Sequence, residues 1–458
     1  MGFIERATAI IGESHVLTGA DMARYANDAQ GQYTSTPLCV LRPASTDEVS
    51  ALMALAHEVG QVVIPVSGNT GVSGGTFNDG AAMLSLERMN RIRAVKPEAR
   101  VAIAEAGVIL DTIRAAADEV GLVFPVVFGA RGSAMVGGIL STNAGGSNVL
   151  RYGNTRAQCL GLEVVLADGR VMDLLGELHK DNSGYDLRDL MIGAEGTLGI
   201  ITAAVLKLAA APAHRATAMV APVSLDAALV MLNRLQEASG GAVEACEYMP
   251  RSYVARHLAK VADAREPFEA AHEVNVLVEL AGDAALTETL ETVLADEMEA
   301  GRVADAVIAQ NDTQRAAMWD RRERASEVLV GGESPLFTGD IALPLDSLTR
   351  FFDEIGTRMA GIAPGVQDSC VAHLGDGNVH YVAYAPEKTE ALTAQASEAQ
   401  DALVAELGGS FSAEHGIGIY KLGSMARHKN PVALDVMRAI KGALDPKGIL
   451  NPGKVIPD

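Results

Sequence analysis

Three glycine-rich stretches, each beside an apolar strand-like run, constrain the fold of this chain most. They are PVSGNTGVSGG at residues 65–75, GARGSAMVGGILSTNAGGSNVLRYGNTR at 129–156 and IGAEGTLGIIT at 192–202. Glycine supplies 46 of the 458 residues, which is about 10% against a usual ~7%. Because glycine reaches positive φ and has no Cβ, these stretches let the backbone approach a ligand or another segment closely.

The first stretch comes directly after an apolar strand, and its free N–H groups predict that it holds an anion such as a phosphate. It is not a Walker loop, because no G-K-[ST] follows, and it does not match G-x-G-x-x-G leading into a helix. A flexible loop is the alternative, which the length and the preceding strand disfavour. For the second and third stretches, close helix–strand packing explains the glycines as well as a ligand does.

Charge and cysteine usage exclude several classes of protein. The net charge of −21 argues against nucleic-acid binding, which needs a basic face. No apolar run approaches the roughly 20 residues of a membrane span, and Glu5 and Arg6 stand where a signal peptide needs apolar residues. The four cysteines form no C-x-x-C, which disfavours an iron–sulfur cluster or a disulfide framework. We expect a location in the cytoplasm or an organelle matrix, with any membrane association made through an electron acceptor.

Strand-like and helical runs alternate in the first half. Strands are predicted at residues 38–44, 62–68, 81–86, 101–108, 160–169 and 199–208, and helices at 45–60 and 109–121. Ser45 or Thr46 caps the first helix and Gly60 ends it. After residue 214, Ala-rich amphipathic helices (225–240, 287–299, 390–408) alternate with β-like runs (273–282, 382–386). This pattern predicts an α+β domain in which helices cover one face of an antiparallel sheet. The last segment, 428–458, predicts a helix and a Pro/Gly-rich tail that docks back onto the first domain.

The stretch HLGDGNVH at residues 373–380 indicates a hairpin with a two-residue turn at its central D-G pair. Such a turn would make His373 and His380 direct cross-strand partners with Cβ atoms about 5 Å apart. Asn378 would lie on the same face, opposite a glycine that leaves room for a ligand. A polar hairpin with structural histidines is the alternative, but two opposed histidines suit a shared metal ion better.

The metal site needs a further ligand, and SAEHGIG at residues 412–418 offers Glu414 beside His415. Two histidines and one carboxylate leave coordination positions open for a substrate, as in catalytic zinc sites. Zinc is the first expectation, and the same ligands suit manganese, iron or cobalt. A 2-hydroxy acid could chelate such an ion through its hydroxyl and carboxylate. His415 is the candidate general base that removes the hydroxyl proton, because imidazole titrates near neutrality.

A second group of polar residues lies in MWDRRERASEV, residues 318–328, which is predicted to form one helix. That helix would place Arg322 and Ser326, four residues apart, on one face. Arginine grips a carboxylate with a planar fork, so Arg322 is a candidate clamp for the substrate. Solvated helix charges are the alternative, since Arg321 and Arg324 stand beside it.

The order of the three glycine stretches resembles the FAD-binding domain of the vanillyl-alcohol oxidase and p-cresol methylhydroxylase (VAO/PCMH) superfamily. The later HLGDGNVH, SAEHGIG and DPKGILNPGK narrow the resemblance to the D-2-hydroxyacid dehydrogenases, and it covers nearly the whole chain. It implies an α+β fold: a PCMH-type FAD-binding domain of two α+β subdomains at residues 1–213, a substrate (cap) domain with an antiparallel sheet and the metal site at 214–420, and a C-terminal segment at 421–458 that completes the FAD site.

The resemblance also implies which residues hold FAD. Those that would hold its pyrophosphate are Ser67, Gly68, Asn69, Thr70, Gly71, Ser73, Gly74 and Gly75. Those that would line the flavin are Gly132, Ser133, Gly137, Asn143, Ala144 and Gly145, with Ile200 on the adenine side and Asn451 and Lys454 closing the site. Some members attach FAD through a histidine in the phosphate loop. This loop has Asn69 and no histidine, so noncovalent FAD is implied.

The implied reaction is the FAD- and metal-dependent oxidation of a D-2-hydroxy acid, of the 2-hydroxyglutarate, malate or lactate type, to the 2-oxo acid. His415 would act as base, hydride would pass to flavin N5, and the electrons would leave to an electron-transfer flavoprotein, a quinone or a cytochrome. In hydroxyglutarate dehydrogenases, the arginine that corresponds to Arg322 looks to be joined by a threonine and a lysine. Here Ser326 stands at the place of the threonine, and Thr338 stands at the place of the lysine. Loss of the lysine charge favours a shorter or less charged acid.

Three other functions remain open at this point. The superfamily contains an alkyl-glycerone-phosphate synthase that uses FAD without net oxidation, so a transferase is the first. A flavin-free metallohydrolase built on the same ligands is the second, and a noncatalytic flavoprotein is the third. A homodimer is compatible with all of them.

Overall fold

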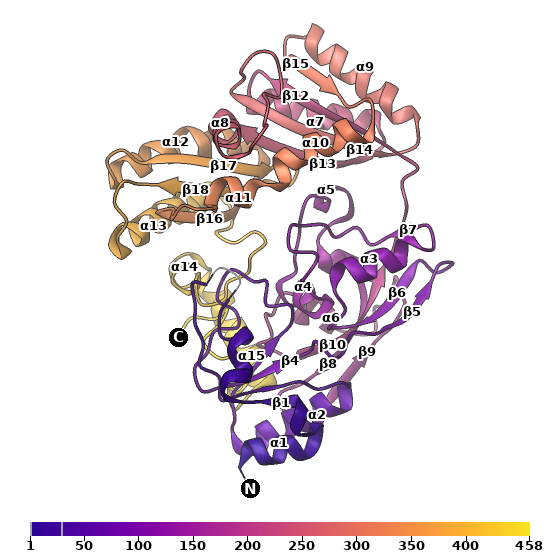
Figure 1. Cartoon of the computed structure of the whole chain (residues 1–458), viewed down its shortest axis with the longest axis vertical. Helices are drawn as coiled ribbons and strands as arrows, with labels where there is room; N and C mark the ends of the chain where they lie inside the picture. Colours follow the sequence, from indigo (N-terminus) through magenta and orange to yellow (C-terminus); the bar gives the residue numbers. More distant parts are fainter. Residues whose placement is uncertain (1, 29–30) are drawn as a thin grey trace. The chain divides into compact units, whose positions relative to one another are not determined.

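A computed structural model of the protein describes residues 2–28 and 31–458 and divides the chain into two compact units (Figure 1). Unit 1 consists of the chain up to Gly146 together with Gly153–Ala211 and Glu414–Asp458. Unit 2 consists of Ser147–Tyr152 and Pro212–Ala413. Within the described residues, no helix combines the length and the apolar character that crossing a bilayer requires.

Unit 1 contains two main sheets. The first has the order β1-β2-β4-β3, with β2, β4 and β3 parallel: β1 (Val16–Leu17), β2 (Cys39–Leu41), β4 (Ala82–Ser85) and β3 (Val63–Val66). The second is antiparallel: β5 (Ile92–Lys96), β6 (Val101–Glu105), β10 (Ile200–Lys207), β8 (Cys159–Val165) and β9 (Val171–Leu174). The short strands β7 (Leu122–Val123) and β11 (Ala209–Ala210) pair with each other.

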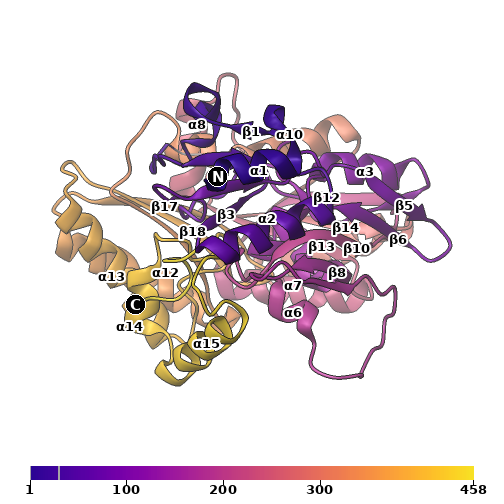
Figure 2. The ribbon, with the colours of Figure 1, turned by 90° about the horizontal axis from the view of Figure 1, so that it is seen from below.

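Unit 1 also contains helices and short turns. They are α1 (Phe3–Ile11), α2 (Thr46–Val59), α3 (Leu110–Asp118), α4 (Val136–Thr142), α6 (Leu187–Met191), α14 (Leu422–His428) and α15 (Pro431–Leu444), with 3-10 turns η1 (Glu13–His15), η2 (Gly19–Tyr25) and η3 (Thr155–Gln158). The Ser45 side chain accepts the N–H of Glu48, and Gly60 ends α2 at φ 74, so both predicted caps are confirmed. The loop between β9 and α6 projects from the rest of unit 1 (Figure 2).

The C-terminal tail packs on the first sheet of unit 1. Leu450 forms a parallel bridge with Val63, in which the Val63 N–H donates to Ile449 and the Asn451 N–H donates to Val63. Lys447 donates to the carbonyl of His57 at the end of α2. The tail therefore continues the sheet beside β3, next to the loop that follows this strand.

Unit 2 is built on one antiparallel sheet of order β15-β12-β14-β13-β17-β18-β16 (Figure 1). The strands are β12 (His214–Pro222), β13 (Val243–Pro250), β14 (Val274–Gly282), β15 (Val303–Ile308), β16 (Phe337–Ala342), β17 (Gln367–His373) and β18 (Asn378–Tyr384). The helices are α5 (Val149–Tyr152), α7 (Leu225–Ala238), α8 (Arg251–Lys260), α9 (Ala285–Glu299), α10 (Asp312–Glu323), α11 (Ala325–Val330), α12 (Leu348–Ile362) and α13 (Glu390–Glu406), with the turn η4 (Leu345–Ser347). The predicted α+β fold with an antiparallel sheet is confirmed.

The expectation that helices cover only one face of this sheet is wrong. The long helices α7, α9, α12 and α13 share one apolar core with the sheet residues Val278 and Val379. The shorter helices α8, α10 and α11 share a second core with Leu277 and Val371 on the other face. Alternate residues of a strand point to opposite faces, and both sets of residues are apolar here, so both faces are covered.

The β17–β18 hairpin has a longer turn than the sequence predicted. His373 pairs with Asn378 and Val371 pairs with His380, so the turn contains four residues instead of the expected two. The Asp376 side chain accepts the N–H of Asn378, and the Gly377 N–H donates to the carbonyl of His373. These bonds close the wider turn. The two histidines therefore lie on one face of the sheet as diagonal neighbours, and Asn378 faces His373 instead of a glycine.

The predicted single helix across residues 318–328 is also wrong. It breaks at Arg324 (φ −77, ψ 9), which ends α10 and precedes α11. Arg322 is buried, whereas Ser326 is exposed. The two residues consequently do not share a helix face, although they stand four apart in the sequence.

Candidate flavin site and candidate metal site

The loop of residues 67–75, called the flavin loop from here on, follows β3 in unit 1. Asn69 adopts φ 51, donates to the carbonyl of Asn27 and accepts from Thr76, so its side chain shapes the loop. The Ser67 hydroxyl is buried and has no hydrogen-bond partner within the described residues. A Cβ added to Gly71 would meet nothing within 4 Å. The loop thus offers open backbone and an unused hydroxyl.

The second glycine stretch packs against the flavin loop. A Cβ on Gly68 would collide with the backbone of Ser133, and one on Gly138 would lie 3.1 Å from the Ser67 side chain. Gly137 packs on Ala106 at the end of β6. Asn143 ends α4 at φ 52, and its side chain accepts the N–H of Arg156. These glycines bring the two stretches together in unit 1.

The third stretch and the C-terminal tail join the same region. Asn451 donates to the carbonyls of Gly75 and Glu195 at 3.0 and 2.8 Å, while its Oδ1 is buried with no partner within the described part of the chain. Lys454 is 4% exposed, and burial lowers its pKa to about 8 although Glu195 opposes the fall. Ile200 is fully buried at the start of β10.

These features fit a bound dinucleotide. Unused buried polar atoms on Ser67 and Asn451 are the expected partners of a polar ligand, because buried polar groups are otherwise paired. Open glycine backbone in the flavin loop suits a pyrophosphate, and a buried lysine suits its charge. The remaining predicted residues, Thr70, Ser73, Gly74, Gly132, Ala144 and Gly145, lie in the same two stretches.

The pKa of Lys454 leads to a prediction for FAD affinity. Lys454 is charged below pH about 8 and can then bind an anion; above that pH, binding the pyrophosphate must first return a proton to it. We expect the dissociation constant of FAD for apoprotein to rise by up to about tenfold per pH unit above 8. Fluorescence titration between pH 6.5 and 9.5 measures this rise. Lys454→Met should bind FAD more weakly at pH 7 and without the rise.

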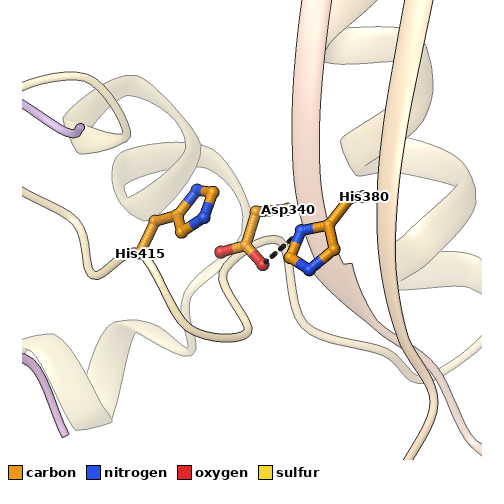
Figure 3. Close-up of side chains that lie close together, drawn as sticks. All are labelled: Asp340, His380 and His415. Carbon is orange, nitrogen blue, oxygen red and sulfur yellow. Dashed lines mark ion pairs between the residues drawn. The ribbon is translucent and has the colours of Figure 1, made fainter. Parts of the chain in front are cut away.

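The candidate metal residues of unit 2 lie on the sheet face beneath α10 and α11. The rings of His373 and His380 stand 5.4 Å apart between centroids, at 82°, and their ligand nitrogens lie within 4.8 Å of each other. His380 Nδ1 lies 3.8 Å from Asp340 Oδ1 on β16, as Figure 3 shows. Asn378 donates to Asp340 Oδ1 at 3.0 Å, and its own Oδ1 is buried without a hydrogen-bond partner in the described residues.

Glu247 on β13 is a functional candidate that the sequence did not reveal. Its Oε1 lies 2.7 Å from His373 Nδ1, and its Oε2 accepts from Arg322 Nε at 2.7 Å. Burial raises the pKa of Glu247, but the charges and hydrogen bonds of His373 and Arg322 outweigh this and hold it below its usual value. A carboxylate at Nδ1 would keep the ring proton on that nitrogen and the lone pair on Nε2, which is how many metal-bound histidines are oriented; here Arg322 Nη2 lies against Nε2. The only signal was its position in the otherwise apolar run VEACEYMP, which contains Glu244 as well.

Arg322 and its neighbours carry partners of their own. Arg322 Nη2 lies 3.4 Å from His373 Nε2, in addition to the Glu247 contact. Arg315 donates from Nε and Nη2 to the two carboxylate oxygens of Glu279 on β14. Thr338 is half-buried on β16, where it pairs with Val382. Asp340 is the second candidate that sequence reasoning missed, although Thr338 two residues earlier was singled out.

Glu414 and His415 belong to unit 1. Glu414 Oε1 accepts the N–H of Gly146 at 2.6 Å, and Ser73 Oγ donates to the carbonyl of His415 at 3.0 Å. In unit 2, the chain runs to Ala413, whose N–H donates to the carbonyl of Asp340 at 3.3 Å. The assignment of Glu414 as a ligand and of His415 as the base stays a prediction.

The side chains of unit 2 offer nitrogen and oxygen donors of the kind that bind a first-row divalent metal. The imidazoles of His373 and His380 lie on one sheet face, Asp340 lies beside His380, and Glu247 is bonded to the ring of His373. Nitrogen and oxygen donors suit zinc, manganese, iron or cobalt, so the metal's identity stays open. Substituting Glu247 by glutamine should weaken metal affinity by about 10 to 100-fold, measured by competition with a chelating dye. Glu297→Gln, which removes a carboxylate paired with Arg302 outside this face, is the matched control and should leave the affinity unchanged.

Comparison with known proteins places both regions in a family context. Residues 37–175 match a family described as "FAD binding domain", and residues 211–455 match "FAD linked oxidases, C-terminal domain". A D-2-hydroxyglutarate dehydrogenase of Xanthomonas citri pv. viticola is 35% identical over 95% of this chain and 93% of its own. The mitochondrial D-2-hydroxyglutarate dehydrogenases of Arabidopsis thaliana and Bos taurus are 33% and 36% identical, over 98% and 91% of this chain and 80% and 76% of theirs.

Two solved structures share the fold. The crystal structure of p-cresol methylhydroxylase with substrate bound aligns with a TM-score of 0.76 at 16% identity, over 100% of this chain and 96% of that one. An alkyldihydroxyacetonephosphate synthase aligns with a TM-score of 0.75 at 17% identity, over 99% and 86%. At such identities the likeness concerns architecture alone, and it agrees with the PCMH-type arrangement that the family resemblance implied.

Proposed function

Because this chain belongs to the FAD-linked oxidases and is an oxidoreductase homologous to D-2-hydroxyglutarate dehydrogenases, we propose that it oxidises a D-2-hydroxy acid to the 2-oxo acid. The single observation that supports this best is the pair His373 and His380, held on one sheet face with Glu247 at the first histidine and Asp340 at the second. A transferase with FAD but no net oxidation has no evident use for this donor set.

Bound FAD would accept the hydride from the substrate carbon. A divalent metal would act as a Lewis acid toward the hydroxyl and carboxylate oxygens. We propose His373 and His380 as its ligands, with Asn378 directing its unpaired Oδ1 to the substrate. Noncovalent FAD would lie on the flavin loop, with Asn451 and Lys454 at its pyrophosphate.

We further propose that Glu414 completes the ligands and that His415 removes the hydroxyl proton. Chain continuity supports this. Ala413 is hydrogen-bonded to the backbone of Asp340, and Glu414 and His415 are the two residues that follow it in the chain, with consecutive Cα atoms about 3.8 Å apart. His415 would thereby act on a substrate that the histidines of unit 2 hold.

Among D-2-hydroxy acids, we propose a preference for short monocarboxylic ones. Arg322, the candidate clamp, already pairs with Glu247, and Arg315 pairs with Glu279. Thr338 carries no charge where hydroxyglutarate dehydrogenases look to have a lysine. A second carboxylate would therefore have to compete for partnered arginines, which costs binding energy. The relatives' named substrate, D-2-hydroxyglutarate, is the alternative.

Steady-state turnover with an artificial electron acceptor tests the function. D-lactate, D-malate and D-2-hydroxyglutarate are compared with their L-enantiomers at matched concentrations. The proposal requires turnover with at least one D-acid and little with its L-form. Turnover with neither enantiomer of any of these acids would remove the proposed reaction.

Restoring a charge at residue 338 tests the preference. Thr338→Lys should raise kcat/KM for D-2-hydroxyglutarate relative to D-lactate by about 10 to 100-fold, since a charged hydrogen bond contributes roughly 1.5–3 kcal/mol. Thr338→Gln, of similar length without charge, is the control. Equal ratios in the two variants would mean that residue 338 does not meet the distal carboxylate.

A further inference from the structure

Glu195 joins three segments of unit 1 that lie far apart in the sequence. Its carboxylate accepts two consecutive backbone N–H groups, those of Ile417 at 2.6 Å and Gly418 at 2.8 Å. Its own N–H donates to Ser141 at the end of α4, and its carbonyl accepts from Asn451. The side chain thus holds the segment that follows His415, while its backbone is fixed to the flavin region.

The segment of residues 414–418, called the base segment here, is shaped to receive this carboxylate. Gly416 and Gly418 adopt φ 74 and φ 52, which turns successive N–H groups toward one anion. A Cβ on Gly416 would lie 2.7 Å from Glu195 Oε1, so glycine is needed for the approach. The geometry is that of a small anion-binding turn with Glu195 as the anion.

Ser73 of the flavin loop holds the base segment as well. Its hydroxyl donates to the carbonyl of His415 at 3.0 Å, and its carbonyl accepts the N–H of Ile419 at 3.0 Å. Glu195 therefore holds the base segment at Ile417 and Gly418, and Ser73 of the flavin loop holds it at His415. Both attachments lie within unit 1, so the orientation of His415 relative to the flavin loop depends on them.

Glu195 has both an unfavourable backbone conformation and a buried carboxylate. It adopts φ 50, which residues other than glycine seldom do. Burial raises the pKa of Glu195, although the two N–H groups and the charges of Lys421 and Lys454 oppose the rise. Strained backbone and costly charges persist where surrounding structure enforces them, which is typical of functional sites.

We infer that Glu195 is a positioning residue: by holding the N–H groups of Ile417 and Gly418, its carboxylate sets His415 at the flavin loop. The inference rests on the proposed function, because it takes His415 as the base. Glu195→Gln keeps the size of the side chain but turns an amide donor toward one of the two backbone donors. The base segment would then lose one of its two bonds to residue 195.

Hydrogen exchange tests the contact independently of activity. In the full-length protein saturated with FAD, the amides of residues 417 and 418 should exchange faster in Glu195→Gln than in the parent protein. Glu163→Gln is the matched control: Glu163 is a carboxylate of unit 1 bonded to Thr46, Thr202 and Arg93, and its loss should leave these amides protected. Unchanged exchange in Glu195→Gln would overturn the inference.

A double-mutant cycle with His415→Ala then tests the role. Glu195→Gln should lower kcat by about 100-fold, the size expected when a reacting group is displaced by about 1 Å, with little change in KM and with FAD content retained. In the His415→Ala background it should lower the residual rate no further. An equal loss in both backgrounds would make Glu195 merely structural. Full activity of His415→Ala would instead show that His415 is not the base, and the hydrogen-exchange result on Glu195 would still be valid.

If Glu195→Gln does not accumulate, Glu195→Asp takes the same two tests, since it withdraws the carboxylate by one methylene.

Discussion

Replacing His415 by glutamine is expected to slow flavin reduction by a D-2-hydroxy acid by about 10²–10⁴-fold, the usual contribution of a positioned acid–base group. Glutamine keeps a polar side chain but cannot take the hydroxyl proton. The backbone of residue 415 would still accept from Ser73, so the segment should stay in place and FAD should remain bound. Rapid mixing of the oxidised protein with substrate, followed at the flavin absorbance, measures the rate.

The control for His415→Gln is His179→Gln. His179 is exposed in the loop between β9 and α6, and its replacement should leave the rate unchanged. A reduction rate in His415→Gln within about threefold of the parent would show that another group takes the proton, because a lost general base costs far more. Glu414 is the nearest alternative in the sequence.

Removal of the His380 imidazole, a proposed metal ligand, is expected to have the other large effect. His380→Ala should lower metal content and lower turnover by more than about 100-fold, since loss of even an outer partner of a metal ligand costs about 10 to 100-fold. Asp340 would then lose its contact with the His380 imidazole, although Asn378 would still donate to it. Metal content by elemental analysis and turnover with a D-acid measure the two losses together.

His214→Gln serves as the control for this variant. His214 begins β12 and hydrogen-bonds Thr287 in unit 2, so it tests the loss of a histidine elsewhere on the same sheet. Both metal content and turnover should be kept. If His380→Ala retained stoichiometric metal, the metal would be bound by other residues, and the histidines of the hairpin would not be its ligands.

The sequence predicted the elements of the fold through local signals. The cap of α2 by Ser45 and its end at Gly60 depend on residues within one helix, and period and composition indicated an antiparallel sheet in unit 2. The register of the β17–β18 hairpin was wrong by two residues because D-G is a local turn signal. The wider turn depends instead on the Asp376 side chain and on the bond from Gly377 to His373.

The residues that sequence reasoning missed depend on distant partners. Glu247 meets His373 across two strands that are 126 positions apart, and Glu195 meets Ile417 across 222. Nothing within a local window indicates such pairs. Arg322 illustrates the same limit, because the sequence suggested a free clamp and the sheet supplies it with Glu247. Family motifs indicated the flavin loop and the histidines, since both stand in short contiguous stretches.

Anaerobic reduction of the flavin by D-2-hydroxy acids, before and after removal of metal, shows whether hydride transfer from these acids to FAD takes place and whether it needs the metal. The FAD-loaded protein is mixed without oxygen with D-lactate, D-malate or D-2-hydroxyglutarate, and the flavin absorbance is followed. We expect that at least one D-acid bleaches the flavin, that chelation abolishes the bleaching while FAD stays bound, and that added zinc, manganese or cobalt restores it. A flavin that no D-acid bleaches, or that bleaches equally fast after complete metal removal, would contradict the account.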